Sequence, residues 1–157
     1  MSGSCQVAVI GAGICSEAES AAAYAVGKVL AENCAILVCG GTGGVMEAAC
    51  HGARDYGGVT VGIVPDTGNG NQFLTIVIRS GMGHARNVLV VQSADAVISI
   101  GGKEGTLSEI AHSLKTGRRV FTYRSWDIPG VIECTTPEEA ALRAVASARR
   151  TRLAEPG

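Results

Sequence analysis

Short apolar segments alternate with helical segments along the whole sequence, and this alternation limits the fold more than any other feature. The apolar segments are rich in Val, Ile and Leu, as is typical of strands covered on both faces. They predict strands over residues 6–10, 35–39, 59–64, 74–78, 96–100, 119–123 and 131–134. Strands that alternate with helices are joined by crossover connections. We therefore expect an α/β fold, a doubly wound, mostly parallel sheet of six to seven strands with helices on both faces.

The helical segments have recognisable ends. Ser16-x-x-Glu19 is a capping box that begins a helix, and Thr136-Pro137-Glu138-Glu139 combines a second capping box with a proline in the first turn. Helices are predicted over about 17–33, from the glycine turn 40–44 to the stop at 57–58, over 82–92, from the turn 101–105 to about 116, and from 136 onward.

The composition is that of one folded domain. Of 157 residues, 46% are hydrophobic, which is enough to fill one core. The 13 basic and 14 acidic residues give a net charge of −1, which argues against a nucleic-acid or acidic-membrane partner. No linker or repeat divides the sequence, so we expect a single domain over residues 1–150 and a flexible tail over 151–157.

The six cysteines form no CxxC pair and no Cys/His spacing of a zinc site, so no metal site is predicted. The N-terminus lacks the basic and apolar regions of a signal peptide, and the apolar runs are too short for a membrane span. We therefore expect a cytoplasmic protein with reduced thiols, most of them in the core. Cys15 and Cys39 differ from the others because they lie beside glycine-rich turns.

The 22 glycines gather in three turns that each join a predicted strand to a predicted helix. At a helix N-terminus, unpaired backbone N–H groups and the helix dipole favour an anion, and glycine lets phosphate oxygens approach the backbone. The alternative is that these tight turns only require positive φ angles. The turns predict a phosphorylated small-molecule ligand, with candidate binding residues Gly11, Gly13, Gly40, Gly41, Thr42, Gly43, Gly44, Gly101, Gly102, Lys103, Gly105 and Thr106.

Two common phosphate-binding signatures are excluded. The first turn does not read GxGxxG, and the second strand ends in Cys39-Gly40 without a carboxylate for a ribose, so NAD binding is not expected. GxxxxGK[ST] does not occur either, which excludes a P-loop NTPase.

Two of the turns resemble motifs of the LOG-like superfamily, which also carries the label "lysine decarboxylase". Residues 40–46 (GGTGGVM) are similar to its GGxxG-[Leu/Val]-Met turn, and residues 101–109 (GGKEGTLSE) are similar to its PGGxGTxxE motif. Arg86 falls where these proteins carry an arginine on the preceding helix. The resemblance covers residues 6–125 and is nearest to the small bacterial branch that includes the molybdenum cofactor carrier proteins. It implies a Rossmann-like domain that binds a nucleotide or phosphate.

The resemblance adds Arg86 and Glu109 to the candidate site, as catalytic residues if the protein is an enzyme. Arg86 would pair with a phosphate, and Glu109 would hold a ribose hydroxyl or assist loss of a base. Two simpler alternatives are a solvated helix arginine at Arg86 and a capping box at Thr106-x-x-Glu109. Lys103 either supplies a charge to phosphate or is solvated.

Two functions follow from the resemblance. The first is a binding protein for a nucleotide monophosphate or the molybdenum cofactor, with no cofactor required. Three departures from the family motifs favour it: Asn87 in place of a lysine, Gly101 in place of a proline and Lys103 in place of a glycine. The alternative is a nucleoside 5′-monophosphate phosphoribohydrolase, which retention of Arg86 and Glu109 favours. Lysine decarboxylation is not expected, because no lysine has the context of a Schiff base. The resemblance and the alanines at 21–25 predict a homodimer or homotetramer.

Overall fold

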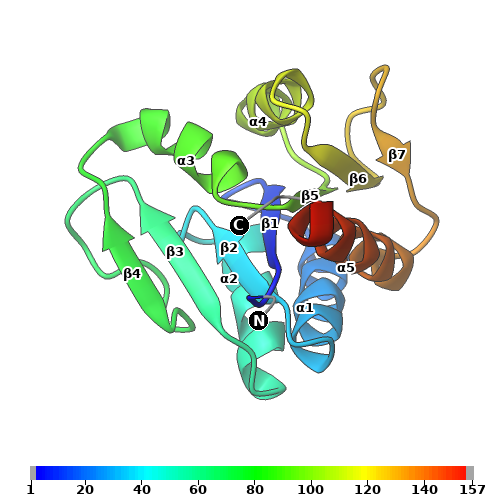
Figure 1. Cartoon of the computed structure of the whole chain (residues 1–157). Helices are drawn as coiled ribbons and strands as arrows, with labels where there is room; N and C mark the ends of the chain where they lie inside the picture. Colours follow the sequence, from blue (N-terminus) through cyan, green and yellow to red (C-terminus); the bar gives the residue numbers. More distant parts are fainter. Residues whose placement is uncertain (1–2, 155–157) are drawn as a thin grey trace.

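The alternating segments build one seven-stranded sheet in which every pair of neighbouring strands is parallel (Figure 1). The computed structural model describes residues 3–154. The strands lie in the order β4-β3-β2-β1-β5-β6-β7. This confirms the predicted fold. The strands are β1 (Gln6–Gly11), β2 (Ile36–Cys39), β3 (Thr60–Val64), β4 (Ile76–Arg79), β5 (Ala96–Ile100), β6 (Arg119–Tyr123) and β7 (Ile132–Glu133).

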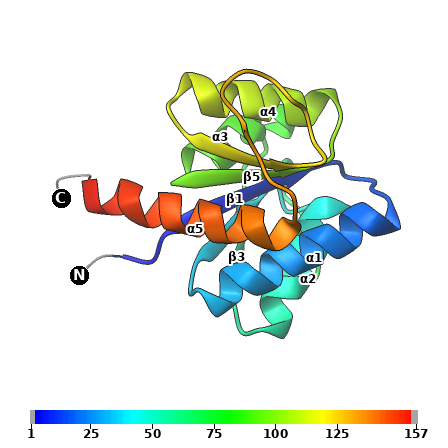
Figure 2. The ribbon, with the colours of Figure 1, turned by 90° about the vertical axis from the view of Figure 1, so that its right-hand side faces the viewer.

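Helices cover both faces of the sheet, as Figure 2 shows edge-on. On β1, Val7 and Val9 point into the core beneath α1, α2 and α5, whereas Ala8 and Ile10 point to the core beneath α3 and α4. Strand residues therefore alternate between two apolar layers. The helices are α1 (Glu17–Glu32), α2 (Val45–Asp55), α3 (Arg86–Gln92), α4 (Glu104–Lys115) and α5 (Pro137–Ala154). Within residues 3–154, none of the helices has the length and apolar character that a membrane crossing requires.

The helix expected over 82–92 begins later than predicted. Residues Gly83–Ala85 form a single turn of 3-10 helix, and α3 starts at Arg86. Gly83 has a φ of 58°, a left-handed conformation that cannot continue into an α-helix. This break places Arg86 at the first turn of α3.

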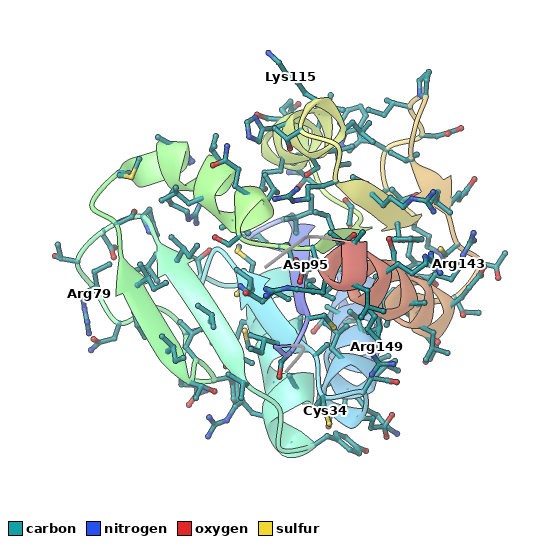
Figure 3. All side chains as sticks on the ribbon, viewed as in Figure 1. Cys34, Arg79, Asp95, Lys115, Arg143 and Arg149 are labelled. Atoms are coloured by element: carbon teal, nitrogen blue, oxygen red, sulfur yellow. The ribbon has the colours of Figure 1, made fainter. Side chains whose placement is uncertain are left out.

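The C-terminal helix is longer than predicted. Residues 151–154 continue α5, so the expectation of a flexible tail is wrong for them, while residues 155–157 lie outside the described part. The Nε of Arg152 donates to Oδ2 of Asp95 at 2.8 Å, which ties the end of α5 to the residue before β5. Figure 3 shows Asp95 beside α5. A contact between residues so distant in sequence leaves no local signal.

The order in which strands are added to the sheet reverses between β1 and β5, although the strands themselves stay parallel. The chain builds β1 to β4 outward on one side and then crosses back to place β5 on the other side of β1. Connections on the two sides of this point diverge, so a crevice opens beyond the carboxyl ends of β1 and β5. This is where a ligand site is expected in an open α/β sheet.

Candidate functional site

A cleft of about 430 Å³ occupies this switch point. Its walls come from the end of β1 and the turn after it, the turn after β2, the start of α3 and the first turns of α4. It therefore brings together parts of all three predicted glycine turns with the two residues that the resemblance added. The predicted residues that line it are Gly11, Gly13, Gly40, Thr42, Arg86, Lys103, Gly105, Thr106 and Glu109.

The remaining predicted residues do not line this cleft. Gly43 borders a depression next to the loop that follows β3, and Gly44 borders a groove between α1 and α2. Gly41, Gly101 and Gly102 have φ angles of 72°, 54° and 98°. At these three positions the glycines are explained by the geometry of the turns, which require a left-handed backbone that favours glycine.

Arg86 is buried at the base of the cleft, with only 7% of its surface exposed. Its Nε donates to the carbonyl of Ile63 at 2.9 Å, and one Nη2 hydrogen bond reaches the carbonyl of Gly40 at 3.2 Å. Nη1 donates to the side-chain oxygen of Asn87. Burial lowers the pKa of Arg86, and the charge of Glu109 opposes that shift. The alternative of a solvated helix arginine is wrong.

Three of the five N–H groups of the Arg86 guanidinium are used by these partners. One N–H on each terminal nitrogen is left for a ligand. Because the carbonyls of Gly40 and Ile63 hold the group from two different strand ends, the guanidinium is preorganised as a fixed positive charge. Such a charge suits a phosphate or a carboxylate.

Glu109 lies on α4 and is partly buried in the same cleft. Burial raises the pKa of its carboxyl to about 7, against the opposing charge of Arg86. Within residues 3–154 no side chain or backbone group forms a hydrogen bond or an ion pair with the Glu109 carboxylate. The capping-box alternative is wrong, because α4 starts at Glu104 and Thr106 already lies in its first turn. The N-cap is Lys103.

The helices that follow the three turns start differently. At α1 the predicted capping box is present: Ser16 Oγ accepts from the Glu19 amide at 3.1 Å, and the Glu19 carboxylate accepts from the Ser16 amide at 2.9 Å. No side chain caps α2 or α4 in the described part of the chain. The carbonyl of Ala12 accepts from the first amide of α2, that of Val45, at 3.0 Å.

The start of α4 is thus the open helix end of the cleft. Amides in a first turn have no acceptor within their own helix, and Gly105 and Thr106 carry two of them to the cleft wall. A methyl group built on Gly105 would meet no atom within 4 Å, so a ligand can approach the backbone there. The indole N–H of Trp126 donates to the carbonyl of Lys103 at 3.1 Å and braces the turn from outside.

Several residues of the cleft were not among the predicted ones. Asn87 accepts a hydrogen bond from Arg86 and orients it. His84 also lines the cleft, and Met46 and Ile14 add apolar side chains to it. Asn87 was recognisable only as a departure from the related motif. Nothing in the pattern around His84 or Ile14 indicates a site. Among the described residues, no three His, Cys, Asp or Glu side chains form a group that could hold a metal ion.

Known proteins resemble this chain in sequence and in fold. A protein of Archaeoglobus fulgidus described as uncharacterized is 48% identical over 147 residues, covering 90% of this chain and 95% of that protein. The molybdenum cofactor binding protein from the phototrophic bacterium Rippkaea orientalis has a similar structure, with a TM-score of 0.85 and 31% identity over 92% of this chain and 96% of that chain.

The Moco carrier protein from Chlamydomonas reinhardtii is similar over 94% of this chain and 99% of that chain, with a TM-score of 0.86 and 26% identity. The family model of SLOG cluster 4 matches residues 4–152, which is nearly all of the described chain. The LOG-like resemblance of the sequence motifs is confirmed. The chain belongs to the SLOG cluster 4 family.

Proposed function

We propose that this protein binds a phosphorylated small molecule, a nucleotide or a molybdopterin-type cofactor, in the cleft between β1 and β5. The observation that carries this proposal is the pairing of a buried, preorganised Arg86 with the uncapped start of α4. Arg86, Gly105 and Thr106 line the same cleft, so the guanidinium and the two amides would together hold one anionic group. Two proteins of similar structure, a molybdenum cofactor binding protein and a Moco carrier protein, support the class of ligand.

The dimensions of the cleft agree with this class. Its volume of about 430 Å³ lies in the usual range of small-molecule sites and leaves room for a heterocycle beside Met46 and Ile14. The phosphate would lie at Gly105, and the ring would extend toward the turn after β1. The ligand is cargo, so no resident cofactor is required.

Two measurements test the proposal. Native mass spectrometry of the purified protein should detect a bound mass that carries phosphate, and calorimetric titration with AMP should give saturable binding. Absence of both, with AMP tested to millimolar concentration, would contradict the proposal. Titration with adenosine is the matched control, because it lacks the phosphate that Arg86 and α4 are expected to hold.

Hydrolysis of a nucleoside 5′-monophosphate is a second candidate function, and the raised pKa of Glu109 favours it. A carboxyl group with a pKa of about 7 is partly protonated at neutral pH and can donate a proton to a leaving base. Asn87 in place of the family lysine favours the binding function. Incubation with AMP, followed by chromatography for free adenine, separates the two. Release that Glu109→Gln abolishes would identify an enzyme.

A homodimer or homotetramer is proposed on the family likeness alone. The alanines of α1 do not support it, because Ala22 and Ala23 are buried within the subunit. Gly27 of α1 packs against the backbone of Ala49 in α2, so the small face of that helix is already occupied. Light scattering that gave the mass of one chain at high micromolar concentration would exclude an oligomer.

A further inference from the structure

Two buried thiols lie on β2 and α2, beside residues that line the cleft, and take no part in the proposed function. Cys39 is the last residue of β2, and Cys50 lies in the middle of α2. Neither side chain is exposed, and their sulfur atoms are 3.5 Å apart. This is the contact of a strand residue with the helix packed over it, and both thiols are free.

The two thiols are not equivalent. Sγ of Cys39 accepts a hydrogen bond from the backbone N–H of Gly41 at 3.3 Å, and it also lies within hydrogen-bond reach of Cys50. These hydrogen bonds and the charge of Arg86 lower the pKa of Cys39, while burial opposes the shift. The pKa of Cys50 is raised by its hydrogen bond with Cys39 and by burial. Cys39 is therefore the more acidic thiol of the pair, and the one that reacts as a thiolate.

We propose that Cys39 and Cys50 form a reversible disulfide when a hydroperoxide reaches them, and that this cross-link weakens ligand binding in the cleft. The first half rests on the geometry of the two sulfurs. The second half rests on the proposed binding function.

The reaction balances with a hydroperoxide as the two-electron oxidant. The Cys39 thiolate attacks the nearer peroxide oxygen, the O–O bond breaks, and the leaving alkoxide or hydroxide takes a proton. Cys39 is then a sulfenic acid. The sulfur of Cys50 attacks the Cys39 sulfur, the S–O bond breaks, and the hydroxyl leaves as water with the thiol proton of Cys50. Two thiols are oxidised to one disulfide, and the peroxide is reduced to an alcohol or to water.

Burial selects the oxidant. Neither sulfur is exposed even to a water-sized molecule, so an oxidant reaches the pair only when α2 and the end of β2 open locally. A small opening admits hydrogen peroxide, whereas a bulky disulfide reagent needs a larger one. Cys15 is partly exposed, and Cys34 lies at the surface after α1, as Figure 3 shows. Bulky reagents should therefore modify Cys34 first and leave the buried pair untouched.

A cross-link would disturb the cleft because it joins β2 and α2, and each of these elements leads to or carries a residue that lines the cleft. A disulfide requires the sulfurs to approach from 3.5 Å to about 2.05 Å, so the end of β2 and α2 must move toward each other. Gly40 directly follows Cys39 and accepts the Nη2 hydrogen bond of Arg86. Met46 lies one turn before Cys50 and lines the cleft. Oxidation thus displaces two parts of the cleft at once: the Gly40 carbonyl that holds the guanidinium, and the apolar wall at Met46.

The experiment uses the full chain with Cys15→Ser and Cys34→Ser, which removes the accessible thiols. After treatment with hydrogen peroxide, we expect a mass loss of about 2 Da for the two hydrogens, a cross-linked peptide that contains Cys39 and Cys50, and recovery with dithiothreitol. Titration with AMP should give a dissociation constant at least about fivefold higher for the oxidised form, the lower end of common coupling between sites.

Cys50→Ala is the matched control, because Cys39 then has no partner for a disulfide. Peroxide treatment of this variant should leave its AMP affinity unchanged. A peptide map without the cross-link overturns the proposed disulfide. This measurement uses protein in which Cys39 and Cys50 are both intact, so it does not depend on whether a variant of the pair folds. A cross-link with unchanged AMP affinity overturns the coupling to the cleft. If the reduced protein fails to bind AMP and native mass spectrometry finds no phosphate-containing ligand, the binding function fails, while the peptide map still decides the disulfide.

Discussion

The starts of α1 and α4 look alike in sequence but have different chemistry. Each helix follows a strand and a glycine-containing turn, and each first turn carries a glutamate. At α1, Ser16 and Glu19 satisfy each other's backbone amides, so the helix end is closed by its own side chains. At α4 the N-cap is Lys103, whose side chain does not cap, and the first-turn residues Gly105 and Thr106 line the cleft.

A glycine turn before a helix is thus not sufficient for an anion site. The residue at the N-cap decides whether the amides are available, and a serine with a glutamate three residues later uses them. The start of α2 is intermediate, since the carbonyl of Ala12 occupies one amide. Of the three predicted phosphate loops, we expect the start of α4 to hold the anion.

The largest effect is expected from the paired substitutions Glu109→Gln and Glu19→Gln. The pKa of Glu109 is about 7 in the folded protein and near 4.5 in the unfolded chain. Between these values the folded protein keeps a proton that the unfolded chain releases, so stability falls as pH rises from 4.5 to 7. The loss is on the order of 3 kcal/mol. Glutamine cannot ionise, so Glu109→Gln should lose this slope and exceed the parent in stability at pH 8.

Glu19→Gln is the control, because glutamine also serves in a capping box. Its stability should follow that of the parent protein at every pH. Urea unfolding at pH 5 and pH 8 measures both variants. If the free energy of unfolding changes with pH in the same way for Glu109→Gln and the parent, burial does not raise the pKa of Glu109.

The second effect is on binding. Arg86→Ala removes the charged hydrogen bonds to the ligand, which are worth about 1.5–3 kcal/mol, so AMP affinity should fall by about 10- to 150-fold. Arg119→Ala is the matched control, since Arg119 is exposed at the amino end of β6, away from the cleft. Calorimetry measures affinity, and a thermal melt shows whether the variants remain folded. An unchanged affinity for Arg86→Ala would remove Arg86 from the site.

Much of this fold was predictable because its signals are local. The strands carry continuous apolar runs, and β5 and β6 have the predicted bounds. The capping box at Ser16 also marks the start of α1 correctly. The motif resemblance located Arg86 and Glu109, whose positions in one cleft depend on the parallel order of strands that are distant in sequence.

The rest of the site depends on packing that no local pattern records. Arg86 is buried because the ends of β2 and β3 both present carbonyls to it. The Thr106-x-x-Glu109 pattern suggests a cap, yet α4 begins before Thr106 and turns Glu109 toward the cleft. The end of α5 is fixed by Asp95, which no helix signal near residue 151 could indicate.

The third effect compares the two helix starts directly. Gly105→Ala adds a methyl where no protein atom lies within 4 Å, so it should not disturb the fold. Gly13→Ala is the matched control, because a methyl at Gly13 also meets open space. If the anion lies against α4, Gly105→Ala should weaken AMP binding by about tenfold, or about 1.4 kcal/mol. Gly13→Ala, before the closed start of α1, should change it less. Equal losses would contradict the difference between the two starts.

The smallest effect tests the closed start itself. Ser16→Ala removes the side chain that caps α1, so the free energy of unfolding should fall by about 1 kcal/mol. Ser20→Ala is the control, because Ser20 lies within α1 rather than at its N-cap and alanine is the better helix former. AMP affinity should stay within about twofold for both variants, which is under 0.5 kcal/mol. If Ser16→Ala weakens binding as much as Gly105→Ala does, α1 takes part in holding the ligand, and its capping box does not separate it from α4.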